Sequence, residues 1–144
     1  MRHRVAGKKL TADTQHRIAL RRNLARALFL HGRIITTQAK AKAFRRYVEK
    51  LVTRAKKANA LRDTDRAGYV HQVRLLRREI QDREVLATLV DRIAPLCKDR
   101  PGGYTRILRH PTNSLGDNAP RVVWEFVDRP AVEVEEGAEA EAAK

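Results

Sequence analysis

The sequence has 144 residues, enough for one domain whose folding buries roughly two-thirds of the surface of the unfolded chain. Its 31 Lys and Arg residues outnumber 17 Asp and Glu, and the net charge of +14 favours a polyanionic partner, nucleic acid first and an anionic membrane surface second. A single cysteine, Cys97, excludes an internal disulfide and fits a buried thiol in a reducing compartment. No stretch approaches the ~20 apolar residues that would span a membrane.

The charge is distributed unevenly along the chain. Residues 1–60 hold 17 Lys and Arg against Asp13 and Glu49, a net of 17 − 2 = +15. Residues 1–12 are predicted to form an extended basic arm, which orders when phosphates neutralise it. This start has no apolar stretch behind its cations, so it is not a secretory signal, although a mitochondrial transit peptide would share its Arg-rich composition.

The first half of the chain predicts a helix, a short strand and a second helix. Thr11 or Asp13 can cap the first helix, and His31 with Gly32 ends it. Residues 33–37, RIITT, are rich in β-branched side chains and predict a strand. Thr37 can cap the second helix, whose apolar residues recur at helical spacing: Phe44, Tyr47, Val48, Leu51, Val52 and Ala55.

The second half predicts two more helices followed by two strands. Asp63 or Thr64 can cap the third helix and Asp82 the fourth, where Pro95 strains the last turn. After Gly102 and Gly103 the apolar period changes to two, which predicts strands at 104–109 and 121–127. The second strand places Val122, Trp124 and Phe126 on one face.

This order, α-β-α-α-α-β-β, predicts an α+β fold with two layers, in which a small sheet packs against helices. The predicted organisation is a basic arm at 1–12, one RNA-binding domain at 13–129 and a tail at 130–144. Residues 131–144 carry Lys144 against five glutamates, a net of 1 − 5 = −4. With two valines and no aromatic residue the tail buries too little apolar surface to fold, so we expect it to be disordered.

A search for catalytic or metal-binding patterns gives none. The five histidines are scattered, without a second histidine or a glutamate at a metal-binding interval. Ser114, the only serine, is not in a nucleophile elbow, and the paired glycines lack the Gly-Lys-Ser/Thr of a phosphate-binding loop. We therefore expect no enzyme activity, no cofactor, no metal and no small-molecule substrate.

The basic surface has an alternative interpretation, because runs of charge are often only solvated helix faces. Such a face normally interleaves acids with its bases, yet residues 14–48 contain no Asp or Glu. A polyanionic partner explains this better. Neutralising roughly 6 to 10 phosphates would lower the affinity about 10³- to 10⁵-fold between low and moderate salt.

Several motifs together resemble one known family. They are MRHRVAGKKL at the start, HRIALRRNLARALFLHGRIITTQAKAKAFRR after it, then RPGGYTRI and GDNAP. In this order and spacing they are similar to the bacterial large-subunit ribosomal protein seventeen family, over essentially residues 1–128. The resemblance implies a cytoplasmic, structural component of the large ribosomal subunit. It would bind the large ribosomal RNA near the rim of the polypeptide exit tunnel and neighbour large-subunit protein number thirty-two.

The resemblance and the charge pattern together indicate the RNA-binding residues. The arm would thread into RNA grooves, and the junction at Thr36 and Thr37 would offer helix N–H groups to a phosphate. Asn23 also matches the family's first helix. The predicted site residues are Arg2, His3, Arg4, Lys8, Lys9, His16, Arg17, Arg21, Arg22, Thr36, Thr37, Lys40, Lys42, Arg45, Arg46, Tyr104 and Arg106.

Some alternatives stay open at this point. Tyr104 is balanced between core packing and base stacking, whereas Trp124 is favoured as a core residue. Leu115 stands before Gly116-Asp117 where the family pattern has a basic residue, which puts RNA contact by that turn in doubt. The alternative function is a nucleoid-type DNA-binding module, and an enzyme acting on RNA comes third.

Overall fold

The structure is a computed structural model that describes Lys8, Leu10 and residues 13–128. Most of the predicted basic arm and all of the tail therefore lie outside the described residues. The elements are α1 (Thr14–His31), β1 (Arg33–Thr37), α2 (Gln38–Leu61), α3 (Arg66–Arg77), α4 (Arg83–Ala87), a π-helical segment η1 (Thr88–Ile93), α5 (Ala94–Leu96), β2 (Thr105–Arg109) and β3 (Arg121–Phe126). Because α4, η1 and α5 follow one another without a break, the predicted order and the α+β class are confirmed.

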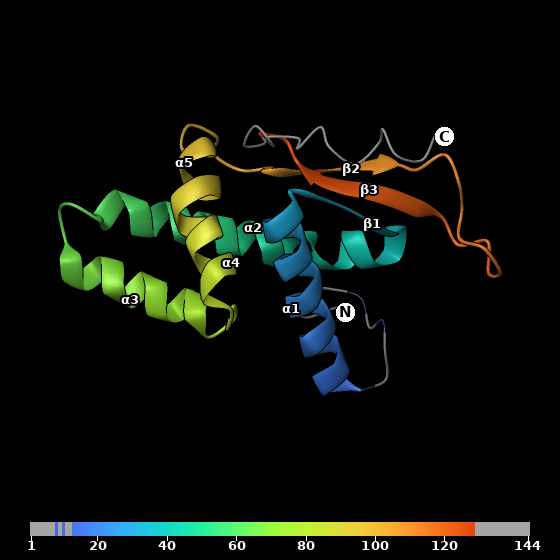
Figure 1. Ribbon diagram of the computed structural model, residues 1–144, viewed down its shortest axis with the longest axis horizontal. Helices are drawn as coiled ribbons and strands as arrows, with labels where there is room; N and C mark the ends of the chain where they lie inside the picture. Colours follow the sequence, from blue (N-terminus) through green and yellow to red (C-terminus); the bar gives the residue numbers. More distant parts are fainter. Residues whose placement is uncertain (1–7, 9, 11–12, 129–144) are drawn as a thin grey trace, which may run out of the picture.

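The three strands form an antiparallel sheet in the order β1-β3-β2, so β3 is central and β2 has a free edge. Figure 1 shows the sheet as one layer, with α2 running beneath it, α1 and α3 on the same side, and the helix from α4 to α5 rising to the level of the sheet at its left. Val122, Trp124 and Phe126 are buried, as their alternation predicts. Phe126 stacks on Phe29 of α1 with ring centroids 6.1 Å apart, which joins the sheet to the helical layer.

The first helix begins and ends where its capping signals predict. The Asp13 carboxylate accepts hydrogen bonds from the backbone N–H groups of Gln15 and His16, which decides between the two predicted caps. At the other end Gly32 has φ +67°, a left-handed conformation that glycine adopts without steric cost, and its N–H returns to the Leu28 carbonyl.

The second helix buries the predicted stripe except Tyr47, which is partly buried, and it does not use the predicted cap. Thr37 occupies the N-cap position, yet its side chain bonds none of the first-turn N–H groups. The Gln38 N–H instead donates to the Pro120 carbonyl at 3.0 Å, so the turn before β3 covers the start of α2. Phe44, Val48 and four further apolar positions are buried against the sheet and the later helices: Leu51, Val52, Ala55 and Ala58.

The start of the third helix corrects a prediction. Its cap is Asp65, whose carboxylate accepts from the Gly68 N–H at 3.0 Å, and not Asp63 or Thr64. The α2 helix continues to Leu61, so the two earlier candidates lie in the turn between the helices. Asp82 caps α4 as predicted. The strain expected at Pro95 coincides with the wider π-helical turn of η1, which immediately precedes α5.

The start of β2 differs from the prediction, in which residues 104–109 form one strand and alternate between its two faces. Gly103 turns the backbone with φ +66°, and Tyr104 precedes the strand, so it does not share a face with Arg106. Tyr104 and Thr105 are buried whereas Arg106 and Leu108 are exposed. Cys97 is buried as expected, and burial raises the pKa of its thiol, which fits a structural role.

Candidate nucleic-acid interface

The solvent side of α2 carries a row of cations that we call the basic stripe: Lys42, Arg46, Lys50, Arg54 and Lys57. The first four are spaced four residues apart, so each lies one turn from the next on the same face. All five are exposed, and within residues 13–128 none of them forms an ion pair. Like charges at this spacing repel one another, so a partner that supplies negative charge would stabilise the stripe.

A groove lies beside the N-terminal half of α2, between this helix and residues of β2 and β3. It has a volume of about 620 Å³ and is lined by Gln38, Lys42, Arg45, Arg106, Ile107, Arg109 and Val122. We call it the α2–β2 groove. Four of these seven residues are cations and no acidic side chain lines it, so its walls suit an anionic chain.

Two of the groove cations are already paired inside the protein. Arg45 Nε donates to Glu49 Oε1 at 3.0 Å, and Arg106 Nε donates to Glu125 Oε1 at 2.6 Å. Lys42 and Arg109 have no acidic partner among the described residues. The paired arginines are held in place, and Arg106 still leaves half of its side chain exposed (52%). The groove therefore combines positioned guanidinium groups with free cations.

The groove continues around the N-terminus of α2. A second hollow of about 370 Å³ shares Gln38 and Lys42 with it and adds Lys8, Thr37, Ala39, Asp117, Ala119 and Pro120. First-turn N–H groups have no intrahelical partner, and this end of a helix attracts anions. The hydrogen bonds from Ala119 N–H and from Ser114 lower the pKa of Asp117, so a fixed negative charge stands in this hollow.

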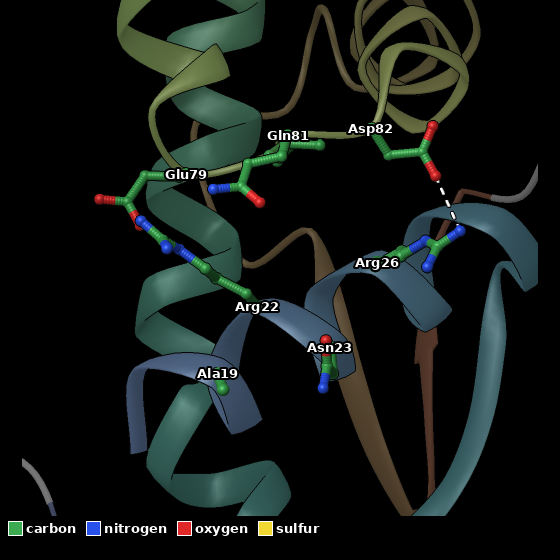
Figure 2. Close-up of a pocket in the computed structure, with 8 residues that line it drawn as sticks. Ala19, Arg22, Asn23, Arg26, Glu79, Gln81 and Asp82 are labelled. Atoms are coloured by element: carbon green, nitrogen blue, oxygen red, sulfur yellow. Dashed lines mark ion pairs between the residues drawn. The ribbon is translucent and has the colours of Figure 1, made fainter. Parts of the chain in front are cut away.

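The arginines of α1 are arranged differently from those of α2. Arg21 Nη2 lies 3.2 Å and Arg22 Nε 3.7 Å from Glu79 Oε2, and Arg26 pairs with Asp82 at 2.8 Å. Figure 2 shows this hollow, with the side chain of Arg22 directed at Glu79 and the Arg26–Asp82 pair marked. The predicted contacts at Arg21 and Arg22 are thus partly neutralised within the protein.

The two aromatic residues left open by the sequence are both core residues. Trp124 is fully buried and Tyr104 is 2% exposed. Lys56 Nζ lies 5.1 Å from the Tyr104 ring centroid, and the Tyr104 hydroxyl lies 3.4 Å from Thr53 Oγ1. No face of the Tyr104 ring is open to a base, so its prediction as an RNA-binding residue is corrected to a packing role.

The remaining predicted residues fall into three groups. Lys8, His16, Lys42 and Arg46 are exposed; Arg17, Thr36, Thr37, Lys40 and Arg45 are partly exposed. Arg2, His3, Arg4 and Lys9 lie outside the described residues. The sequence prediction missed Gln38, Lys50, Arg54, Lys57 and Arg109. The spacing of four residues along α2 would have found Lys50 and Arg54.

Other kinds of site have no support in the part of the chain that the structure describes. No group of three or more His, Cys, Asp or Glu side chains is placed to hold a metal ion among those residues. None of their helices is both long and apolar enough to cross a bilayer. The basic surface around α2 is therefore the candidate binding surface of the described residues.

The sequence matches the family described as ribosomal protein L17 over residues 20–127. This chain belongs to the ribosomal protein L17 family. It is 46% identical over 139 residues to the large ribosomal subunit protein bL17 of Anaeromyxobacter sp. strain Fw109-5, an alignment that covers 96% of this chain and 76% of that protein. Its membership of the L17 family confirms that it is not an enzyme.

Two shorter relatives in the L17 family align over their whole length. The bL17 of Thermus thermophilus is 42% identical over 128 residues, which is 89% of this chain and 100% of that protein. The bL17 of Sulfurihydrogenibium sp. strain YO3AOP1 is 43% identical over 131 residues, 91% of this chain and 100% of that protein. This chain therefore has 144 − 128 = 16 residues without a counterpart in the Thermus protein.

Proposed function

We propose that this protein is a structural component of the large ribosomal subunit and binds large-subunit ribosomal RNA through the basic stripe and the α2–β2 groove. The observation that carries the proposal is the continuity of these two surfaces. Lys42 belongs to both, and no acidic residue lines the groove. Family membership supplies the ribosomal context.

Most of the proposed contacts position the protein on RNA without reading its sequence. Lys42, Arg46 and Lys50 project from one face of a rigid helix, so they can follow a phosphate backbone. Arg109 and Arg106 add planar guanidinium groups, which bind phosphates with two parallel hydrogen bonds. Specificity then comes from the folded shape of the RNA, because side chains cannot read the deep groove of an RNA helix.

The N-terminal arm would extend this surface. Lys8 lines the hollow at the N-terminus of α2, next to Thr37 and Lys42. We propose that Arg2, His3, Arg4 and Lys9 contact RNA beyond that hollow. Phosphates would supply the neutralising charge that the arm lacks in the free protein.

The family resemblance supports a proposal for the location in the ribosome. We propose that the protein acts in the cytoplasm, near the rim of the polypeptide exit tunnel, beside large-subunit protein number thirty-two. Chemical cross-linking of intact large subunits followed by mass spectrometry tests this arrangement. Cross-links from Lys8 or Lys50 to that neighbour or to tunnel-rim proteins would support it, and cross-links only to proteins of the opposite face would overturn it.

A pair of charge reversals with a matched control tests the RNA-binding surface. In Lys42→Glu/Arg46→Glu the basic stripe loses two adjacent cations, whereas Arg66→Glu/Arg74→Glu makes the same net change on exposed positions of α3. Binding to a large-subunit RNA fragment is measured from 50 to 300 mM salt. We expect only the first variant to bind more weakly, with a salt slope reduced by about 2 because two phosphate contacts are lost. Equal losses in both variants would contradict the proposal.

Two further observations separate RNA binding in the ribosome from the DNA-binding alternative. The proposed protein co-sediments with large subunits after a salt wash, whereas a nucleoid protein fractionates with DNA. Deleting residues 1–9 should weaken RNA binding and flatten its salt slope while the unfolding temperature is unchanged. An unchanged slope would show that the arm does not contact phosphates.

A further inference from the structure

We propose that the acidic segment that follows β3, residues 131–144, binds in the α2–β2 groove when RNA is absent and is displaced by ribosomal RNA. This inference rests on the proposed function, because it assigns the same groove to RNA and to the segment in turn. The segment lies outside the described residues, and its assignment to the groove follows from the lining of the groove, from the charges of the segment and from where it joins the sheet.

Of the three hollows described above, the α2–β2 groove is the one whose lining includes no carboxylate. The α1 hollow contains Glu79 and Asp82, and the hollow at the start of α2 contains Asp117. The α2–β2 groove is lined by four cations and no carboxylate. Two of the cations, Lys42 and Arg109, have no acidic partner among the described residues, so they are available to glutamates.

The composition of the segment complements this lining. Its charged residues are the terminal Lys144 and five glutamates: Glu133, Glu135, Glu136, Glu139 and Glu141. Val132 and Val134 alternate with Glu133 and Glu135, so an extended backbone would present valines on one side and glutamates on the other. The groove offers both chemistries, because Ile107 and Val122 lie among its cations.

The attachment point makes the contact intramolecular. Phe126, the last residue of β3, is the register partner of Thr105, the first residue of β2, and β2 forms one wall of the groove. Sixteen residues beyond Asp128 can span up to about 50 Å, whereas a five-residue strand is only about 17 Å long. A tether of this kind provides a local concentration on the order of millimolar, so even weak ion pairs are populated.

The consequence is selection against weak RNA ligands. A short RNA must displace the glutamates before it contacts Lys42 and Arg109, whereas ribosomal RNA also contacts the basic stripe and overcomes the competition. A variant of this chain that ends at Asp128 lacks all five glutamates of the segment and is expected to lack the effect. Salt screens the attraction of the groove for the acidic segment over about 8 to 10 Å. The inhibition of short-RNA binding by the segment is therefore largest at low ionic strength.

The contact is tested first without RNA. A photoreactive benzoyl-phenylalanine replaces Val134 in the full chain, and cross-linked peptides are identified by mass spectrometry. We expect cross-links to peptides that contain Gln38 to Arg45 or Arg106 to Arg109, and their loss when a large-subunit RNA fragment is added. Cross-links only to α3, or none at all, would overturn the inference.

RNA binding is then measured with a single-stranded RNA 12-mer and with a large-subunit RNA fragment. A variant with all five segment glutamates changed to Gln should bind the 12-mer about fivefold more tightly at 50 mM salt and less than twofold more tightly at 300 mM. A charge-matched pair compares Glu133→Gln/Glu135→Gln with Asp63→Asn/Glu84→Gln, which removes two negative charges from exposed positions outside the segment and should show a smaller gain. Equal affinities of the full chain and the glutamine variant, with RNA binding intact, would refute the inference alone. Failure of either protein to bind the ribosomal fragment would refute the proposed function, whatever the cross-links show.

Discussion

The Tyr47 hydroxyl donates a 2.9 Å hydrogen bond to Glu79 Oε2, which is also the oxygen 3.2 Å from Arg21 Nη2. The Arg21 guanidinium lies 4.7 Å from the Tyr47 ring centroid, so the three side chains contact one another. They come from α2, from the segment after α3 and from α1. The cluster therefore holds α1 against α2 and the segment after α3. These contacts fix the position of α2, the helix that carries the basic stripe.

Replacing Glu79 by Gln should lower the free energy of unfolding by about 1 to 2 kcal/mol, because two arginines lose their charged partner while the side chain keeps its shape. Urea unfolding followed by circular dichroism measures the change. Glu84→Gln, on an exposed position of α4, is the matched control and should change the free energy by less than about 0.5 kcal/mol. Similar values for the two variants would show that the cluster adds no stability.

The same cluster predicts a dependence on pH. Burial raises the pKa of Glu79, but the Tyr47 hydrogen bond and the charges of Arg21 and Arg22 outweigh it, so the pKa lies below its usual value. A depressed carboxyl pKa contributes stability above the unfolded value of about 4.5, and this contribution is lost as the pH falls through the folded value. The difference between the native protein and Glu79→Gln should therefore shrink below about pH 4.5. A difference that is constant from pH 7 to pH 3 would contradict the assignment.

How far the sequence predicts this fold depends on how local each signal is. Asp13, Gly32 and Asp82 act on residues within one turn, and their predicted roles are confirmed. At the third helix the predicted cap was Asp63 or Thr64, but both residues lie in the turn that follows the end of α2 at Leu61, and Asp65 is the cap. Nothing in a periodicity of 3.6 indicates the π-helical turn of η1.

The residues of the candidate site also divide into those that local patterns predict and those that depend on contacts distant in the sequence. Lys42 and Arg46 were predicted because the apolar stripe of α2 determines which side chains face solvent, although the prediction stopped short of Lys50 on the same face. For Arg21 the deciding partner is Glu79, which lies 58 residues away in the sequence, so its internal ion pair was not visible there. Tyr104 was ambiguous because Gly103 changes the alternation just before the strand. Arg109 becomes a groove residue only through the packing of β2 beside α2.

The cap of α3 and a nearby glycine should show coupled stability effects. A Cβ on Gly68 would lie 2.3 Å from Asp65 Oδ2, so alanine there forces the capping carboxylate to move. Asp65→Ala alone should cost about 1 kcal/mol of unfolding free energy. Gly68→Ala alone should be nearly neutral, because a helix-propensity gain of about 1 kcal/mol offsets the damaged cap.

In the double variant the carboxylate is absent, so Gly68→Ala should then stabilise the protein by about 1 kcal/mol relative to Asp65→Ala. Thermal and urea unfolding of the four proteins give this coupling energy. Additive effects would show that the carboxylate moves aside without losing its hydrogen bond to the Gly68 N–H.

Leu115 offers a gain-of-binding prediction. It is 99% exposed in the loop that also places Asp117 and Pro120 beside the start of α2. Leu115→Arg should leave the unfolding free energy unchanged and tighten binding to a large-subunit RNA fragment, with the salt slope steeper by about 1. Leu115→Gln is the neutral control. Equal affinities of the arginine and glutamine variants would place this loop away from the RNA.

The environment of the Trp124 indole predicts that Trp124→Phe lowers the free energy of unfolding only slightly. The side chain is fully buried, and within the described residues its Nε1–H has no hydrogen-bond acceptor. Replacing Trp124 by Phe therefore removes no hydrogen bond and leaves only a partly filled space, at a cost of about 1 to 2 kcal/mol. Trp124→Ala should cost about 3 to 5 kcal/mol, because β3 is the central strand and its inner face loses the whole ring. Urea unfolding followed by circular dichroism compares the two, and a Phe variant as unstable as the Ala variant would show that the indole N–H is hydrogen-bonded in solution.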